Sequence, residues 1–173
     1  MVALLRGVNV GGRGSLPMAD LRRVATDLGY ADVATYIQSG NLVLRTSDSV
    51  SKVTNDLASA IAGLGVKPAV MVRSRSQLAK VVDANPFLRR GEDAASCHVT
   101  FMETAASGAL TPLELARYAP EEVKAVGKEL YLFLPGGMGR SKLAADLLRN
   151  KKAVGTTRNW RTITKLLEMA DAL

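Results

Sequence analysis

The stretch that decides the fold is "YIQSGNLVLRT", Tyr36–Thr46. Two runs of strand-forming residues flank a short polar segment. A Ser-Gly pair inside that segment is typical of a hairpin turn, because glycine tolerates a positive φ. We therefore predict an antiparallel hairpin whose first strand includes Tyr36 and Ile37. Two amide side chains, Gln38 and Asn41, flank the turn, and they raise the question of whether the turn also binds a ligand.

Helix and strand patterns extend outward from this hairpin in both directions. Before it come an apolar strand at Val2–Leu5, a glycine-rich loop and a helix after Pro17 with apolar residues at helical spacing. After it come a helix capped by Ser49 or Ser51 and a strand within residues 67–74. The order β-α-β-β-α-β is that of a ferredoxin-like half.

The same order recurs after a linking helix and loop at residues 75–95. We therefore predict an α+β chain of two ferredoxin-like (βαββαβ) halves with antiparallel sheets, at residues 1–74 and 96–173. Asn159 is the expected N-cap of a C-terminal helix. The halves show no obvious sequence identity, so the repeat is one of element order. In the second half we expect strands at 97–102, 121–126, 129–134 and 153–157, and helices at 111–119, 141–150 and 160–173.

Composition excludes several classes of protein. Of the 173 residues, 47% are hydrophobic and 23% charged, as in a folded protein, and no apolar run is long enough for a membrane span. The first residues lack the pattern of a signal peptide. A single cysteine, Cys97, excludes an internal disulfide and fits a reducing compartment, so we expect a cytoplasmic location. A single histidine, His98, leaves no cluster for zinc, and we expect neither a metal nor a cofactor.

The positive charge is concentrated near the C-terminus. The net charge is +7, and the segment from residue 140 to residue 165 carries all of that excess, since Asp146 is its only acid. A local basic field of this kind attracts phosphates, nucleic acid or acidic surfaces, although it is also compatible with a merely solubilising face. Its basic residues are Arg140, Lys142, Arg149, Lys151, Lys152, Arg158, Arg161 and Lys165.

The predicted topology gathers polar residues at one end of each sheet. In a ferredoxin-like half the loop after the first strand and the turn after the second emerge at the same edge, as do the ends of the third and fourth strands. The first half therefore brings together Arg6, Asn9, Gly11, Gly12, Gln38, Ser39 and Asn41, and the second brings together Arg140, Ser141, Lys142, Thr157, Arg158, Asn159 and Trp160.

Several blocks of the chain together resemble a known family. The blocks are "LLRGVNVGG", "YIQSGNLVL", "NPF", "SKL" and "GTTRNWRTITKLLEM", in that order along nearly the whole chain. They are similar to the bacterial family called domain of unknown function 1697, in which Ile is more usual at Val8, Asn at Arg161 and Val at Ile163. The resemblance implies two ferredoxin-like halves. It implies no established reaction, and a role in nucleic-acid binding is compatible with it.

The first polar group has two readings. Backbone N–H groups in the glycine loop "RGVNVGGRG" can bind an anion at the start of a helix, or the glycines can simply let the chain leave a strand. The loop lacks the Lys-Ser/Thr of a phosphate loop, which argues against an ATPase. In "QSGN" the amides of Gln38 and Asn41 can bind a ligand or satisfy local backbone groups.

The second polar group also has two readings. Ser141 is a helix cap, and Arg140 and Lys142 lie beside the positive end of that helix. Cations are electrostatically unfavourable there, and a bound phosphate would offset this cost. Trp160 can stack on a base while Arg158 meets the phosphate, or the ring can pack into the core. Neither group contains a titratable base, so no catalytic residue is nominated.

These patterns favour nucleic-acid binding through the basic C-terminal surface. Phosphates would contact Arg140, Lys142, Arg158, Arg161 and Lys165. Trp160 would stack on a base, and Asn159, Gln38 and Asn41 would form hydrogen bonds to the polar edges of bases. The alternative is an enzyme or small-ligand binder for a nucleotide or other anionic metabolite at the junction of the halves. A protein-interaction module that uses a sheet edge is a third class.

Overall fold

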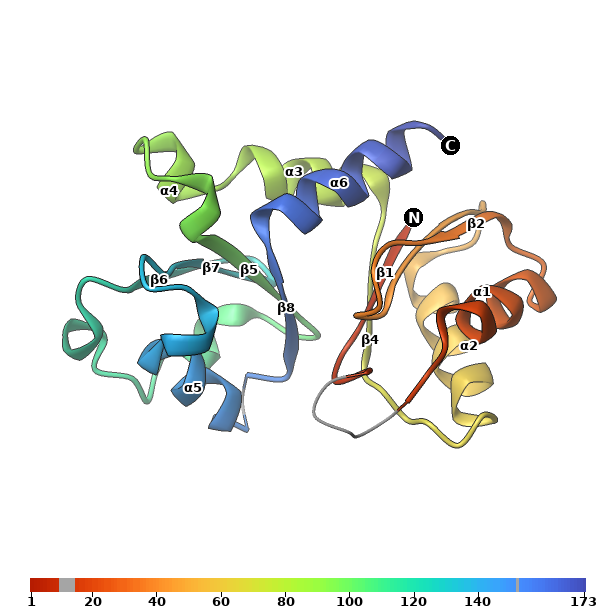
Figure 1. Cartoon of the computed structure of the whole chain (residues 1–173), viewed down its shortest axis with the longest axis horizontal. Coiled ribbons are helices and arrows are strands. Elements are labelled where there is room, and N and C mark those ends of the chain that lie inside the picture. Colours follow the sequence, from red (N-terminus) through yellow and green to blue (C-terminus); the bar gives the residue numbers. More distant parts are fainter. Residues whose placement is uncertain (10–14, 152) are drawn as a thin grey trace. The chain divides into compact units, whose positions relative to one another are not determined.

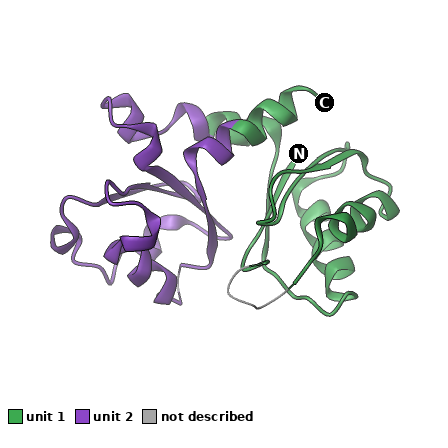
Figure 2. Cartoon of the chain, viewed as in Figure 1, with its two compact units in different colours: residues 1–80, 165–173 green, residues 81–164 purple. Residues whose placement is uncertain are grey.

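The computed structural model describes residues 1–9, 15–151 and 153–173 and shows an α+β chain with two four-stranded antiparallel sheets (Figure 1). The chain divides into two compact units, residues 1–80 with 165–173, and residues 81–164 (Figure 2). The predicted fold class, with two ferredoxin-like halves and a C-terminal helix, is confirmed. Within the described ranges, every helix is too short or too polar to cross a bilayer.

The first unit follows the predicted order of elements. Its sheet has the strand order β2-β3-β1-β4, and both long helices lie on one face of the sheet (Figure 1). Ser49 caps the second helix by accepting a hydrogen bond from Lys52 N at 3.2 Å, as its sequence position predicts. The elements are β1 (Val2–Leu5), α1 (Met18–Asp27), β2 (Ala31–Thr35), β3 (Asn41–Arg45), α2 (Val50–Ala62) and β4 (Val70–Arg73).

Periodicity explains the core of the first unit. Leu21 of α1 and Leu57 and Ile61 of α2 stand at helical spacing on inward faces, and all three are fully buried. They belong to the same cluster as Leu42 and Leu44, which alternate along β3 and so share one face of the sheet. A face of the sheet covered by two helices is the usual way to bury one apolar layer.

The hairpin turn is longer than the sequence predicts. We expected the first strand to include Tyr36 and Ile37, but β2 ends at Thr35, so that prediction was wrong. Tyr36 N donates to Asn41 O at 3.1 Å, which closes a turn over the residues between them. Ile37 has φ 49° there, an uncommon value for a β-branched residue, and its side chain is 52% exposed.

The linking segment forms helices broken before a proline. Helix α3 (Arg75–Asp83) is followed by α4 (Pro86–Arg89), and Asn85 caps α4 by accepting from Phe87 N at 3.0 Å. The break was expected, because the residue before proline avoids the helical conformation. A short 3₁₀ helix, η1 (Ala94–Ser96), then leads into the second sheet.

The second unit has the strand order β6-β7-β5-β8. The helix predicted at 111–119 is wrong, since the structure has a 3₁₀ turn there. Pro112 and Pro120 bracket that segment and leave room for one tight turn. The elements are β5 (Cys97–Met102), η2 (Ala106–Ala109), η3 (Leu115–Tyr118), β6 (Glu122–Val126), β7 (Glu129–Phe133), η4 (Met138–Arg140), α5 (Lys142–Arg149), β8 (Gly155–Asn159) and α6 (Trp160–Asp171).

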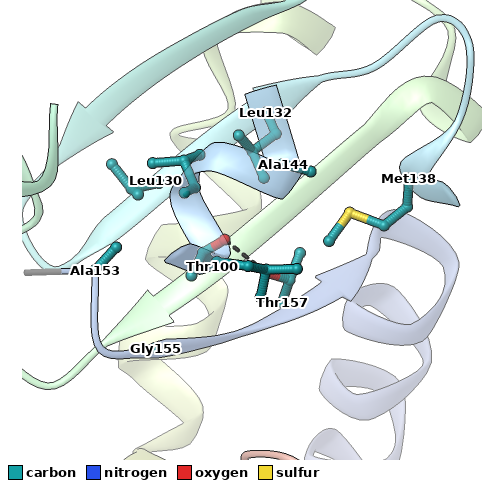
Figure 3. A pocket seen from close by; sticks show the side chains of 10 residues that line it. Thr100, Leu130, Leu132, Met138, Ala144, Ala153, Gly155 and Thr157 are labelled. Atoms are coloured by element: carbon teal, nitrogen blue, oxygen red, sulfur yellow. Dashed lines mark hydrogen bonds between the residues drawn. The ribbon is translucent and has the colours of Figure 1, made fainter. Parts of the chain in front are cut away.

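Helix α5 packs on one face of the second sheet and leaves a small apolar cavity. The side chains of Leu130 and Leu132 line it from β7, and Met138 lines it from η4 (Figure 3). Thr100 and Thr157 meet across neighbouring strands, with their hydroxyl oxygens 2.8 Å apart (Figure 3). The cavity volume is about 10 Å³, room for about one water molecule and not for a substrate.

Candidate functional site

The first polar group lies where β1 ends and the hairpin turns. Leu5 N donates to Gly40 O at 2.9 Å, and the side-chain amide of Asn9 donates to Gln38 O at 2.8 Å. The structure therefore brings these two segments together, as the topology predicts. Gly11 and Gly12, which we assigned to the same group, lie outside the described residues.

Most polar atoms of this group bind the chain itself. The side chain of Asn9 donates to Leu16 O and accepts from Leu16 N, both at 2.8 Å. Asn41 is fully buried, and its amide donates to Tyr36 O and Ser39 Oγ, both at 3.0 Å. Such bonds stabilise a turn and consume the donors that a ligand would need.

Two side chains of this group have donors that bind no described residue. The guanidinium of half-buried Arg6 and the side-chain amide of exposed Gln38 form no hydrogen bond or ion pair with a described residue. Gly40 has φ 72°, and a Cβ there would stand 2.8 Å from the Cβ of Leu5. The turn therefore needs glycine for both conformation and space.

The second polar group lies at one edge of the second sheet. Strands β7 and β8 both pair antiparallel with β5, one on each side of it, so their carboxyl ends reach the same edge. Met138 of η4 and Thr157 of β8 line the same small cavity (Figure 3). The turn that begins at Met138 is thus near β8, whereas the placement of Arg140 and Lys142 beside Asn159 and Trp160 stays a prediction.

The start of α5 already holds a carboxylate. Ser141 caps the helix by accepting from Ala144 N at 2.9 Å, and the neighbouring Leu143 N donates to Glu121 Oε2, also at 2.9 Å. We expected a phosphate to offset the cations beside this positive helix end. Glu121 supplies a negative charge in its place, since helix N-termini favour anions of any kind.

The basic residues of the C-terminal segment fall into distinct groups. Arg149 pairs with Asp146 at 3.0 Å and Lys165 pairs with Glu168 at 2.6 Å, so their charges are partly neutralised. Lys152 lies outside the described residues. Four exposed cations form no ion pair with a described residue, and of these Lys151 follows α5 at the other end of that helix. The four are Arg140, Lys142, Lys151 and Arg161.

Arg158 belongs to the interior and not to this exposed surface. Its side chain is 8% exposed, and its Nη1 donates to Thr156 Oγ1 at 2.6 Å and to Thr157 O at 2.9 Å. Burial lowers the pKa of Arg158 to about 10, because desolvation disfavours the charged form. Its alternation along β8 turns it away from the face that carries Thr157.

A groove opens where β8 passes into α6. Its volume is about 480 Å³, within the range of small-molecule sites, and all of its lining residues belong to the second unit. Three of the residues that we assigned to a ligand site lie here. The lining consists of Ala94, Ala95, Asn159, Trp160, Arg161 and Thr164.

Cys97 and His98 show no catalytic arrangement. They are adjacent in β5, so their side chains point to opposite faces of the sheet. Cys97 is fully buried, and burial raises the pKa of its thiol, which keeps it protonated. Among the described residues, no group of three or more His, Cys, Asp or Glu side chains could hold a metal ion.

His98 makes the stability of the chain depend on pH. Its side chain is 8% exposed, and burial lowers its pKa from the ordinary 6.5. The unfolded chain therefore binds a proton that the folded chain does not, and the free energy of unfolding falls as the pH drops below about 6.5. One proton contributes at most about 1.4 kcal/mol per pH unit.

We expect the free energy of unfolding of His98→Gln to fall less than that of the native chain when the pH is lowered from about 7.5 to about 5. Thermal melts at several pH values measure this, and subtracting the two curves removes the contribution of the carboxylates. Parallel curves for the two proteins would contradict the assignment.

Sequence reasoning missed part of this region. Glu121 stands 22 residues before Leu143, and no local pattern links the two. Ala94 and Ala95 carry no chemical group that suggests a site, and they reach the groove only because η1 precedes β5. The one sequence signal for Ala94 and Ala95 is that they lie in a short polar stretch between two predicted elements, which indicates a connecting loop.

Comparisons with known proteins identify relatives but no activity. A family model described as "Protein of unknown function (DUF1697)" matches residues 1–131. Among solved structures, the chain is similar to the conserved bacterial protein SP0830 from Streptococcus pneumoniae, with 23% identity and a TM-score of 0.76. The alignment covers 98% of this chain and 97% of that one, and at this identity it supports the fold alone. No curated protein matches the chain.

Proposed function

The chain belongs to the DUF1697 family, whose function is unknown, and we propose from its own residues that it binds single-stranded nucleic acid through the second unit. The contact surface consists of Arg140, Lys142 and Arg161, which we call the basic edge. The observation that supports the proposal is that these three cations of the second unit are exposed and pair with no described acid.

Unpaired cations favour a polyanionic ligand. A cation in an exposed ion pair already interacts with an acidic side chain, whereas an unpaired guanidinium or ammonium group is available to bind a phosphate oxygen. Arg140 Nε donates to Gly136 O at 3.1 Å, which holds the side chain against its own turn and leaves its other N–H groups available. This preorganisation lowers the entropy lost on binding.

A single strand fits the basic edge better than a duplex. Helix α5, which begins at Lys142, is packed on its sheet through Leu143, Ala144 and Leu147 and is therefore not free to enter a major groove. Binding of single strands combines a cationic track with surfaces against which bases lie, and the groove with Trp160 in its wall is such a surface.

Salt dependence tests the proposal. For single strands, the logarithm of the affinity falls by about 0.7 per phosphate contact for each tenfold rise in salt. Three contacts give a slope of roughly −2, or roughly a 20-fold loss between about 50 and 200 mM salt. The measurement is fluorescence anisotropy with a labelled single-stranded RNA. Absence of binding at the lower salt, or an affinity that salt leaves unchanged, would sink the proposal.

Binding of a small anionic ligand is a second candidate, and the volume of the groove favours it. Arg161 is the one ionisable residue in the lining, and an arginine stays charged at neutral pH. The groove therefore offers binding groups but no general acid or base, which favours a binding role over catalysis.

A further inference from the structure

The groove at the start of α6 is lined by residues whose hydrogen-bond donors bind no described residue. Asn159 Oδ1 accepts from Thr162 N at 2.8 Å and so caps the helix. The opposite end of the same amide, Nδ2, donates to no described residue, although the side chain is exposed. The cap thus fixes the side chain and leaves its N–H groups free.

Trp160 adds a donor that needs an explanation. Its side chain is 7% exposed, yet its indole N–H donates to no described residue. Buried N–H groups nearly always have a partner. The nitrogen is not among the described side-chain atoms that are sealed from solvent without a partner, so it keeps some contact with solvent, and Trp160 is one of the residues that line the groove.

The remaining lining residues offer a cation that can bind an anionic group and an apolar surface that can pack against an uncharged one. Arg161 is exposed and has no described acidic partner. Thr164 Oγ1 donates to Trp160 O at 3.2 Å and to Arg161 O at 3.1 Å, so its proton is engaged. The methyl groups of Ala94 and Ala95 form the apolar part, and no carboxylate lines the groove.

We propose that this groove holds one nucleoside monophosphate unit, whose phosphate binds Arg161 and the Asn159 amide and whose base lies against the alanine methyls and the indole. A phosphate alone would leave the apolar wall unused, and a neutral base alone would leave the guanidinium unused. This inference rests on the proposed function, because the unit would be one residue of the bound strand.

The fluorescence of Trp160, the sole tryptophan, provides the test. The native chain is titrated with adenosine 5′-monophosphate, adenosine and inorganic phosphate. We expect a saturable change with the monophosphate, at an affinity at least tenfold above that for either fragment. Equal affinity for inorganic phosphate, or no saturable response to the monophosphate, would overturn the inference.

Two variants locate the binding in the groove. Ala95→Leu fills the groove without changing charge, and Asn159→Ser keeps a capping oxygen but removes the amide donor. We expect each to weaken monophosphate binding at least fivefold. Ala116→Leu is the matched control, because Ala116 is an exposed alanine in the 3₁₀ helix η3 of the same unit, and it should bind as the native chain does. Unchanged binding in both groove variants would overturn the inference, and Asn159→Ser decides if Ala95→Leu fails to fold.

Labelled single-stranded RNA separates this inference from the proposed function. If RNA binds with the expected salt dependence and Ala95→Leu leaves that binding and the monophosphate titration unchanged, the groove is not the nucleotide site but the basic edge remains. If the monophosphate binds and Ala95→Leu abolishes it, while RNA does not bind, the groove is a mononucleotide site and the proposed function is wrong.

Discussion

We expect the triple variant Arg140→Ala/Lys142→Ala/Arg161→Ala to bind single-stranded RNA roughly 100-fold more weakly than the native chain at about 50 mM salt. Each exposed phosphate contact contributes roughly fivefold to the affinity. The charge-assisted hydrogen bond that forms is partly offset by the hydrogen bonds to water that it replaces. The salt dependence should also become flatter, since fewer counterions are released. Anisotropy titrations at several salt concentrations measure both effects.

A control with the same loss of charge separates local contacts from the general field. Lys67, Lys80 and Lys128 are exposed and form no ion pair with a described residue, and all three lie outside the basic edge. Replacing them with alanine should weaken binding only a few-fold, through the long-range field. If this control lost as much affinity as the triple variant, binding would be non-specific charge attraction and the basic edge would not be a site.

We expect Gly155→Ala to be among the most destabilising single substitutions in the second unit. A Cβ at Gly155 would stand 2.6 Å from Phe101 O and 2.8 Å from both Met102 Sδ and Thr100 Cγ2. The first of these is a backbone atom inside the paired sheet, so β8 would have to move away from β5. Overpacking of this kind costs about 3 kcal/mol, or roughly 10 °C in Tm for a chain of this size.

Thermal melts followed by Trp160 fluorescence report on this unit, because Trp160 directly follows β8. Gly139→Ala is the matched control, since a Cβ there would meet nothing within 4 Å and its φ is ordinary. We expect a change in Tm of at most about 2 °C for the control. A Gly155→Ala variant as stable as the native chain would mean that β8 does not pair with β5 in the register Met102 to Gly155.

The candidate site could be predicted from sequence only in outline. The grouping of the loop after β1 with the hairpin turn followed from topology, and the bond from Asn9 to Gln38 across 29 residues bears out their proximity. The same sequence assigned Asn9, Asn41 and Arg161 to ligand contacts. Of these, Asn9 and Asn41 make side-chain bonds that hold the turn, whereas Arg161 is exposed beside a groove.

By itself the sequence determined most of the elements and their order, with the helix at 111–119 as the exception, because those choices depend on near neighbours. The Ser49 and Asn159 caps, the break before Pro86 and the helical spacing in α2 all act within a few residues along the chain. Such short-range signals also led to the two ferredoxin-like halves.

Only the tertiary structure decided which polar groups remain free to bind a ligand. Glu121 reaches the start of α5 from 22 residues away, and η1 and the start of α6 meet to form a groove although they are far apart in sequence. A side chain is available when the folded chain brings no partner to it. That outcome depends on contacts between distant segments, which local spacing does not encode.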